Sequence, residues 1–272
     1  MNNKLIFELK DVYFSYLGRY PALCGIDITI RRGERVTIIG ANGSGKSTLL
    51  HMLDGLIFPD KGTMKAFGSE LNESLFNEED FSVNFRKKVG LVFQNSDVQL
   101  FCPTVKEDIC FGPLQLRVGK KVIERRLDEL IRILNIKDLL DRSPHQLSIG
   151  ERRKVAIAST LIIDPDVLIV DEPTAGLDPL TTRHIIDLLL QANAAGKTII
   201  TSTHDLHIVE EISDVVYVFG QEKRIIRTGN PHEILEDSQL LQANNLIHVH
   251  RHGHKGTTHS HPHLHVYHHE EG

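Results

Sequence analysis

The chain has 272 residues, of which 40% are hydrophobic and 25% are charged, and its formal net charge at pH 7 is −5. This length permits one large domain or a core with a lobe, and the composition is that of an ordinary soluble globular protein. The net charge gives no electrostatic reason to expect nucleic acid as the main partner. Cys24, Cys102 and Cys110 form no CxxC pair, which favours a reducing compartment.

The sequence contains no membrane-spanning signal. No apolar run approaches the roughly 20 residues needed to cross a bilayer. The opening stretch MNNKLIFELKDVYFSY also lacks the apolar segment that follows a basic one in a secretion signal. If the protein works at a membrane, we expect other chains to supply the spanning segments.

Strand-like runs dominate the first forty residues, as KLIFELK, IDITI and RVTIIG. IDITI and RVTII alternate around a Gly-containing break, which predicts a β-hairpin. After residue 40, strands alternate with helical stretches, and the continuous apolar runs suit a parallel sheet covered on both faces. The strands expected in this part are 89–93, 166–171, 197–203 and 215–219.

Residues 104–163 contain many helical stretches and few strand-like runs. KKVIERRLDELIRIL places Val122, Leu127, Leu130 and Leu134 at helical spacings, which predicts an amphipathic helix. We interpret this part of the chain, approximately 98–163, as a helical subdomain inserted between two sheet strands.

A phosphate-binding loop is predicted in RVTIIGANGSGKSTLLHML, which runs from an apolar strand through a glycine-rich loop into a helix start. Glycines let successive N–H groups curl around phosphate oxygens, and the helix N-terminus adds favourable partial charge. In this G-x4-G-K-S pattern, Lys46 is expected to reach the β- and γ-phosphates and Ser47 to coordinate Mg²⁺. The residues expected to hold the nucleoside triphosphate are Gly40, Asn42, Gly43, Ser44, Gly45, Lys46, Ser47 and Thr48.

A second element, PDVLIVDEP, supplies two carboxylates. The apolar run from Val167 to Val170 ends in Asp171 and Glu172, at the sheet edge where phosphates are expected. We expect Asp171 to support Mg²⁺ through a water, and Glu172 to accept or orient the proton of the hydrolytic water.

Together with four further motifs, these stretches resemble the ATP-binding subunit of ATP-binding-cassette (ABC) transporters from residue 5 to about residue 235. The resemblance implies an α/β P-loop NTPase fold with a parallel-sheet core, an N-terminal antiparallel β subdomain and an inserted α-helical subdomain. It also implies that Tyr16 stacks on adenine, with Tyr13 and Tyr20 as alternatives.

The resemblance assigns three more residues around the nucleotide. Gln94 matches the glutamine that contacts the metal and the attacking water and links the site to the membrane subunits. His204 matches the histidine that contacts the γ-phosphate. Asp178, in AGLD, lies in the loop that crosses between subunits.

LSIGERRKVAIAS matches the family's signature stretch, usually LSGGQ, which caps the γ-phosphate bound to the opposite subunit. Ser148 and Gly150, which the family uses on the phosphate, are retained. Ile149 replaces a glycine and would be strained if that position needs φ > 0. Glu151 replaces glutamine and adds negative charge, so we expect the ATP sandwich to form but hydrolysis to be slow.

FQNSDVQLFCPTVKEDICFGP resembles the energy-coupling-factor branch of cobalt/nickel importer type. The branch typically has QNPDDQLF, so Ser96 stands for the proline and Val98 for the second aspartate. The branch implies a second ATPase subunit, identical or different, beneath a transmembrane coupling protein and a membrane substrate-binding protein. It also implies a peripheral position on the cytoplasmic face of the cell membrane, with cobalt, nickel or vitamins as substrates.

Beyond a domain of residues 1–245, residues 246–272 are rich in His and poor in large apolar groups, which predicts a flexible tail. Imidazole suits Ni²⁺ and Co²⁺, and at a reference pKa of about 6.5 most rings are uncharged near neutral pH. A solvated tail without metal is the alternative interpretation. The possible Ni²⁺ or Co²⁺ ligands are His248, His250, His252, His254, His259, His261, His263 and His265.

The sequence therefore predicts an ATPase with ATP and Mg²⁺ that powers import of a divalent transition metal, cobalt or nickel. One alternative is a vitamin importer of the same branch, with an incidental tail. A soluble cassette ATPase of translation or DNA repair is disfavoured, because those chains usually carry two cassettes or a long coiled-coil insertion. A metal-storage protein with a vestigial ATPase is a third alternative.

Overall fold

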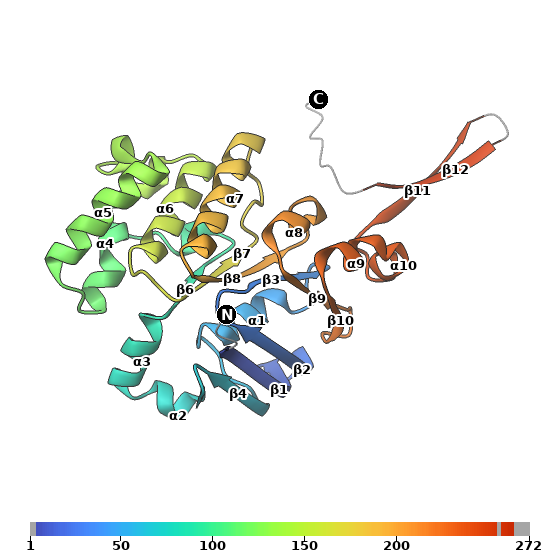
Figure 1. The fold of residues 1–272 in the computed structure, drawn as a ribbon, viewed down its shortest axis with the longest axis horizontal. Helices are drawn as coiled ribbons and strands as arrows, with labels where there is room; N and C mark the ends of the chain where they lie inside the picture. The colour runs from blue at the N-terminus through green and yellow to red at the C-terminus, as the bar shows by residue number, and fades with distance from the viewer. Residues whose placement is uncertain (1–3, 255–256, 264–272) are drawn as a thin grey trace.

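The computed structural model describes residues 4–254 and 257–263, and the side chains of residues 4–247. Its core is a six-stranded sheet with the order β10-β9-β3-β8-β7-β6, beside a four-stranded antiparallel sheet with the order β2-β1-β4-β5 (Figure 1). The strands of the larger sheet are β3 (Arg35–Gly40), β6 (Val89–Val92), β7 (Val167–Asp171), β8 (Thr198–Thr203), β9 (Val215–Phe219) and β10 (Ile225–Gly229). Those of the smaller sheet are β1 (Leu5–Tyr16), β2 (Tyr20–Arg31), β4 (Lys61–Ala66) and β5 (Ser69–Glu70).

The larger sheet is parallel from β6 to β9, and β10 joins it antiparallel to β9. All side chains of β6, β7 and β8 are buried, as are all but the first of β9. Strands covered on both faces have no polar side, which is why β6, β7 up to Val170, and β9 are apolar runs, whereas β8 also buries Thr198, Thr201, Ser202 and Thr203. The predicted parallel-sheet core and N-terminal antiparallel sheet are both confirmed.

The predicted hairpin between IDITI and RVTII is wrong. β2 pairs with β1 in the smaller sheet, whereas β3 pairs with β8 and β9 in the larger one. Ile28, Ile30 and Ile38 belong to one apolar cluster, so the two strands face each other across the core instead of sharing a hydrogen-bonded ladder. Alternation around a glycine break is compatible with both arrangements, because each strand buries alternate residues in either case.

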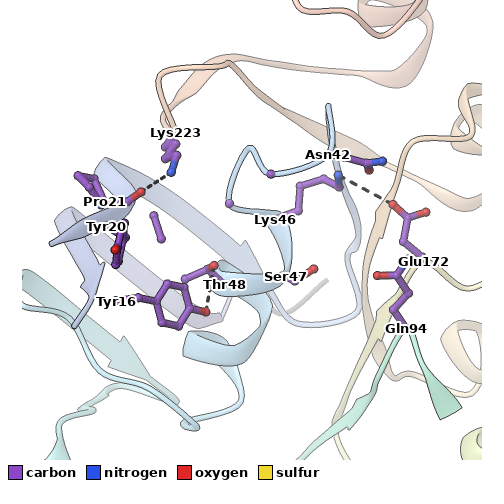
Figure 2. Close-up of a pocket in the computed structure, with 13 residues that line it drawn as sticks. Tyr16, Tyr20, Pro21, Asn42, Lys46, Ser47, Thr48, Gln94, Glu172 and Lys223 are labelled. Carbon is purple, nitrogen blue, oxygen red and sulfur yellow. Dashed lines mark hydrogen bonds and ion pairs between the residues drawn. The ribbon is translucent and has the colours of Figure 1, made fainter. Parts of the chain in front are cut away.

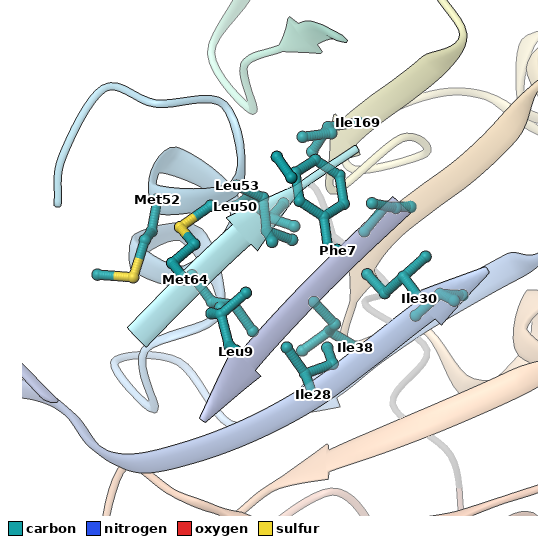
Figure 3. Close-up of a cluster of buried hydrophobic side chains, with 14 of the residues drawn as sticks. Phe7, Leu9, Ile28, Ile30, Ile38, Leu50, Met52, Leu53, Met64 and Ile169 are labelled. Atoms are coloured by element: carbon teal, nitrogen blue, oxygen red, sulfur yellow. The ribbon is translucent and has the colours of Figure 1, made fainter. Parts of the chain in front are cut away.

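The core between the two sheets is filled by side chains from both of them and from helix α1 (Lys46–Leu53). Phe7, Leu9, Leu50 and Leu53 are almost fully buried there and lie together in Figure 3. Burial of such a side chain contributes about 1.5–3 kcal/mol to folding. The helix that starts at the glycine-rich loop is thus fixed against both sheets.

The helical part of the chain lies at one end of the molecule (Figure 1). Its helices are α4 (Val105–Gln115), α5 (Lys120–Leu134) and α6 (Ile149–Leu161), joined by short turns η1 (Ser96–Val98), η2 (Lys137–Leu139) and η3 (Pro144–Gln146). The predicted helix over KKVIERRLDELIRIL is confirmed as α5, but its buried face contains Ile123 and not Val122. Ile123, Leu127, Leu130 and Leu134 are spaced four, three and four residues apart, which is the period of one helix face.

The remaining helices cover the sheets. They are α2 (Glu73–Phe76), α3 (Glu79–Arg86), α7 (Pro179–Ala194), α8 (Leu206–Ile212), α9 (Pro231–Glu236) and α10 (Ser238–Ala243). In the part of the chain that the structure describes, no helix is both long and apolar enough to span a bilayer.

Beyond α10, the backbone of β11 (His248–His254) pairs antiparallel with that of β12 (Thr257–His263), and this hairpin extends away from the sheets in Figure 1. The register sets His248 opposite His263, His250 opposite His261, and His252 opposite His259. The side chains of these histidines and of His254 are not described, and His265 lies outside the described residues.

Candidate active site

The glycine-rich loop connects the end of β3 at Gly40 to the start of α1 at Lys46. Gly43 and Gly45 have φ values of 78° and 111°, a region that side-chain-bearing residues rarely adopt. A Cβ on Gly45 would lie 2.4 Å from the carbonyl oxygen of Ala22 in β2. The smaller sheet therefore presses directly on this loop, and only glycine fits at the contact.

Lys46 is buried beneath the loop, with 6% of its surface exposed. Its Nζ donates to the carbonyl oxygens of Gly40 at 2.7 Å and Ala41 at 3.3 Å, and lies 3.9 Å from Glu172 Oε1. Burial lowers the pKa of Lys46, while the negative charges of Glu172 and Asp171 act in the opposite direction. The ammonium group thus lies between the loop and the carboxylates that end β7.

Glu172 follows β7 directly and is 5% exposed. Its Oε2 lies 2.9 Å from Nδ1 of His204, which follows β8. Because an ionised carboxylate only accepts hydrogen bonds, Nδ1 carries the proton in this pair. The hydrogen bond to Glu172 raises the pKa of His204, and partial burial of the ring opposes that shift. Neighbouring parallel strands have therefore brought the two residues together at one sheet edge.

The preceding residue, Asp171, is buried and accepts a hydrogen bond from the Ser202 hydroxyl of β8. Its charge also faces the imidazole of His51 in α1, where burial lowers the pKa of the ring. This hydrogen bond attaches the Asp171 carboxylate to Ser202 of the neighbouring strand β8. Ser202 lies two residues before His204 in the sequence.

Lys46 and Glu172 line a cavity of about 500 Å³ at the end of the larger sheet, whereas Asp171 and His204 are not among its lining residues (Figure 2). Tyr16 and Tyr20 lie on one side, and Lys46, Gln94 and Glu172 on the other. The Tyr16 hydroxyl is 3.3 Å from Thr48 Oγ1. The lining residues predicted from the sequence are Tyr16, Asn42, Gly43, Gly45, Lys46, Ser47, Thr48, Gln94 and Glu172.

Of the two alternatives to Tyr16, Tyr20 lines the cavity and Tyr13 does not. The Tyr13 ring packs instead over Gly25, whose added Cβ would lie 3.1 Å from the Tyr13 hydroxyl oxygen. The three tyrosines lie in or directly beside the same β-hairpin, so sequence spacing alone could not separate them.

The signature residues lie away from this cavity. Ser148 is the N-cap of α6: its Oγ accepts from the Glu151 N–H at 3.3 Å, and its N–H donates to Glu151 Oε2 at 2.7 Å. Ile149 is the first helical residue and is not among those with positive φ, so the condition for strain at Ile149 is not met. A Cβ on Gly150 would lie 3.1 Å from the Thr181 side chain, which links α6 to the start of α7.

Asp178 is the N-cap of α7. Its carboxylate accepts from the N–H groups of Leu180 and Thr181 at 3.0 and 2.9 Å, and from the Thr181 hydroxyl at 2.6 Å. These hydrogen bonds, the Thr181 hydroxyl first, hold the pKa of Asp178 below its ordinary value. Asp178 and Gly150 therefore both contact Thr181, on a face remote from Lys46 of the same chain.

Sequence reasoning missed several residues of the site. Pro21, Ala22 and Lys223 line the cavity, and the Lys223 ammonium donates to the Pro21 carbonyl oxygen. Arg153 of α6 contacts the backbone on which Gln94 and Glu172 lie. No sequence motif indicates these positions, because a contact with a backbone atom does not require one particular residue type that could be recognised in the sequence.

The donors present fit a magnesium–triphosphate. The Ser44 hydroxyl is buried without a hydrogen-bond partner among the described residues, and the N-terminus of α1 presents unpaired N–H groups. Mg²⁺ is generally held by one or two protein oxygens together with phosphates and waters. The described side chains contain no group of three or more His, Cys, Asp or Glu arranged to hold a metal. Ser47, Gln94 and Asp171 carry the side-chain oxygens expected from the sequence to serve Mg²⁺, and Ser47 and Gln94 line the cavity.

Known proteins resemble this chain in sequence and in fold. A profile of the family described as ABC transporter matches residues 23–175. A putative ABC transporter ATP-binding protein of Methanosarcina acetivorans is 48% identical over 92% of this chain and 91% of its own length. The nickel import ATP-binding protein NikO of Rhodobacter capsulatus is 47% identical over 89% and 95%.

Solved structures show the same fold. CbiO1 of Clostridium perfringens, described as part of the ABC transporter complex CbiONQ, matches with a TM-score of 0.75 and 35% identity over 89% of this chain and 95% of its own. A dimeric ATP-binding cassette bound to ADP and phosphate matches with a TM-score of 0.75 and 27% identity, over 83% and 99%.

Proposed function

Because the chain belongs to the ABC transporter family, whose ATP-binding subunits are ATPases coupled to transport, we propose that it powers import of a divalent transition metal, nickel or cobalt. The observation that carries the ATPase proposal is the convergence of Lys46, Glu172 and His204 at one end of the sheet. In this proposal the hydrolytic water lies between Glu172 and the terminal phosphate.

Each residue then has a defined task. Mg²⁺, when bound by Ser47 and Asp171, would supply neutralisation of phosphate charge. Lys46 exchanges its loop carbonyl contacts for phosphate oxygens, Glu172 accepts the proton of the water, and His204 holds the carboxylate in place. Tyr16 offers a ring for adenine at the far side of the cavity, and Gln94 lines the same cavity, where it would offer its side-chain oxygen to Mg²⁺ and to the water.

In the proposed sandwich arrangement, two ATPase subunits enclose each ATP between them. This arrangement follows from the separation of the glycine-rich loop from the signature residues within one chain. Ser148, Gly150 and Asp178 serve the ATP held by a second ATPase subunit, identical or different. The position of Ser148 outside its own cavity supports this proposal. One solved cassette of the same fold is described as a dimer bound to ADP and phosphate, which supports such a pair.

Exposed apolar side chains follow Gln94 in the sequence and support a surface for membrane partners. Val98 and Phe101 are 66% and 64% exposed, and the ring of Phe101 packs edge-on against Phe111 at 4.9 Å. Exposed apolar side chains gathered in one place favour a protein interface. We assign this surface to a transmembrane coupling protein that works with a membrane substrate-binding protein, which puts the chain at the cytoplasmic face of the cell membrane.

Metal is favoured over a vitamin as substrate by two observations. The relative NikO is described as a nickel import protein, although others of similar identity are named only for the energy-coupling factor. The tail pairs three histidines of β11 directly opposite three of β12. Imidazole is a common ligand of Ni²⁺ and Co²⁺.

The most informative experiment is co-purification of the chain from membranes, followed by identification of the bound chains and metal. A metal importer predicts a complex with two kinds of membrane protein that carries Ni²⁺ or Co²⁺. Recovery of a vitamin-binding membrane protein in their place would contradict the metal proposal and leave the ATPase proposal intact.

The tail is tested separately by titration of Ni²⁺ and Co²⁺ into the full chain and into a chain ending at Ile247. We expect metal binding by the full chain only, because the candidate ligands begin at His248. We expect equal ATP turnover by both, because Ile247 and everything before it are retained. Equal metal binding by the two proteins would refute the role of the tail.

A further inference from the structure

Arg153 lies in the first half of α6 and is 3% exposed. Its Nη1 donates to the carbonyl oxygen of Phe93 at 2.8 Å, and its Nη2 donates to those of Gln94 at 2.7 Å and Glu172 at 3.2 Å. The Arg153 guanidinium therefore binds the backbone of the loop that contains Gln94, called the glutamine loop here. It also binds the backbone of Glu172, the proposed general base. These contacts use the planar fork of donors that only arginine has.

Burial of a charge in this manner is costly unless the surroundings compensate for it. Burial lowers the pKa of Arg153, and the nearby charges of Asp171 and Glu172 counteract that effect. Glu172 itself has a φ of 48°, in the left-handed region that a residue with a side chain adopts only when its surroundings hold it there. Its N–H is held by the Ser202 carbonyl oxygen at 3.1 Å, and its C=O by Arg153.

The glutamine loop is attached to α6 by two further contacts. Gln99 accepts from the Phe93 N–H at 3.1 Å and donates to the carbonyl oxygen of Ala156 in α6 at 2.9 Å. Arg152 forms an ion pair with Asp97 at 3.2 Å. The loop and the helix are thus joined at several points, while Arg153 alone of these side chains also reaches Glu172.

Ser148, the N-cap of the same helix, lies five residues before Arg153. Five residues of α-helix span about 7.5 Å. Helix α6 is a rigid element. It therefore connects Ser148, which in the proposed dimer faces the partner's nucleotide, with the backbone of Glu172, which serves the nucleotide of the same chain.

We propose that Arg153 is a positioning residue that couples the glutamine loop and the signature helix α6 to the general base Glu172. Loop movement imposed by a membrane partner, or α6 movement imposed by a partner's ATP, changes the placement of the Glu172 backbone through this guanidinium. The inference rests on the proposed ATPase function. Under this proposal Arg153 affects ATP turnover and does not affect nucleotide affinity. The reason is that Lys46 and the glycine-rich loop are proposed to hold the nucleotide, and Arg153 makes its contacts elsewhere.

The test compares Arg153→Gln and Arg153→Lys with Arg126→Gln in the full chain. Arg126 is a matched control, because its guanidinium also donates to two backbone carbonyl oxygens, those of Ile162 and Ile163 at 3.1 and 2.8 Å, and it does not line the cavity. For each protein the kcat and KM for ATP, the Kd for MgATP and the melting temperature are measured.

We expect both Arg153 variants to lower kcat by about tenfold or more with KM and Kd within about twofold, because a small misplacement of a base is costly. Lysine is not expected to restore kcat, because an ammonium group cannot reproduce the planar fork. Arg126→Gln is expected to lower the melting temperature without lowering kcat.

The proposal is overturned if Arg153→Lys turns over ATP as fast as the unmodified chain, or if Arg153→Gln loses no more kcat than Arg126→Gln. If Arg153→Gln does not fold, the lysine variant decides the question by itself. Failure of the proposed function would show differently, as absence of ATP turnover in the unmodified chain.

Discussion

Glu172 and His204 form the most specific contact of the site, and each comes from the end of a different strand. The types and spacing of these residues were predicted from the sequence. Their geometry was not, because the positive φ of Glu172 is imposed by the Ser202 and Arg153 contacts on its backbone. A local stretch ending in two acids does not encode such a conformation.

The pKa of His204 is predicted to lie above its ordinary value of about 6.5, because Glu172 favours the protonated ring. An NMR titration of the imidazole should show this shift, and Glu172→Gln should remove it. Since the folded-state pKa is raised, this pair stabilises the protein fully below the unfolded pKa, and the contribution is lost as pH rises through the raised value. An imidazole that titrates at or below the ordinary value would contradict the pairing.

At the scale of elements, the start of α6 shows how a departure from a family pattern is accommodated. Glu151 replaces the usual glutamine and completes a reciprocal capping box with Ser148, and the Ser148 N–H lowers the pKa of the Glu151 carboxyl. Ile149 occupies an ordinary helical position and is 59% exposed. The concern that Ile149 slows hydrolysis through backbone strain therefore has no basis in this structure.

Ile149→Gly is accordingly predicted to leave ATP turnover within about twofold, while lowering the free energy of unfolding by about 0.5–1 kcal/mol, because glycine is a poor helix residue. Steady-state ATPase assays and denaturant unfolding test the two effects. A severalfold gain in turnover would mean that the side chain hinders phosphate capping in the assembled dimer.

The elements also explain the wrong hairpin. The strands β2 and β3 have the alternation and the glycine-containing break of a hairpin, but β3 is buried on both faces and pairs with strands 160 or more residues further along the chain. Pairing partners at that separation are chosen by the tertiary packing. Helix existence was easier to predict, since the hydrogen bonds of α5 are local and only the choice between Val122 and Ile123 on its buried face was missed.

At the scale of the molecule, the glycine-rich loop lines the cavity and the signature residues at the start of α6 do not. In the proposed dimer, where Ser148 of one chain is expected to cap the terminal phosphate bound to the other, each nucleotide is enclosed only while unhydrolysed. The dimer should then be controlled by Glu172.

Glu172→Gln is predicted to retain ATP binding, to lose turnover by about 100-fold or more, and to accumulate an ATP-dependent dimer, since the base is removed and the phosphate is kept. Nucleotide binding, phosphate release and size-exclusion chromatography with MgATP measure these effects. Lys46→Ala is the control, which should lose nucleotide binding and dimer together. Normal hydrolysis by Glu172→Gln would exclude Glu172 as the base.

The sequence by itself determined the family, the glycine-rich loop between a strand and a helix, the two carboxylates at the end of β7 and the alternation of strands with helices, because these depend on local residue patterns. The tertiary structure alone decided which strands pair, that Tyr20 lines the cavity and Tyr13 does not, and that Arg153 joins carbonyl oxygens from two separate segments. The physical reason is that these contacts join backbone groups and side chains distant in the chain, and many different sequences can supply them.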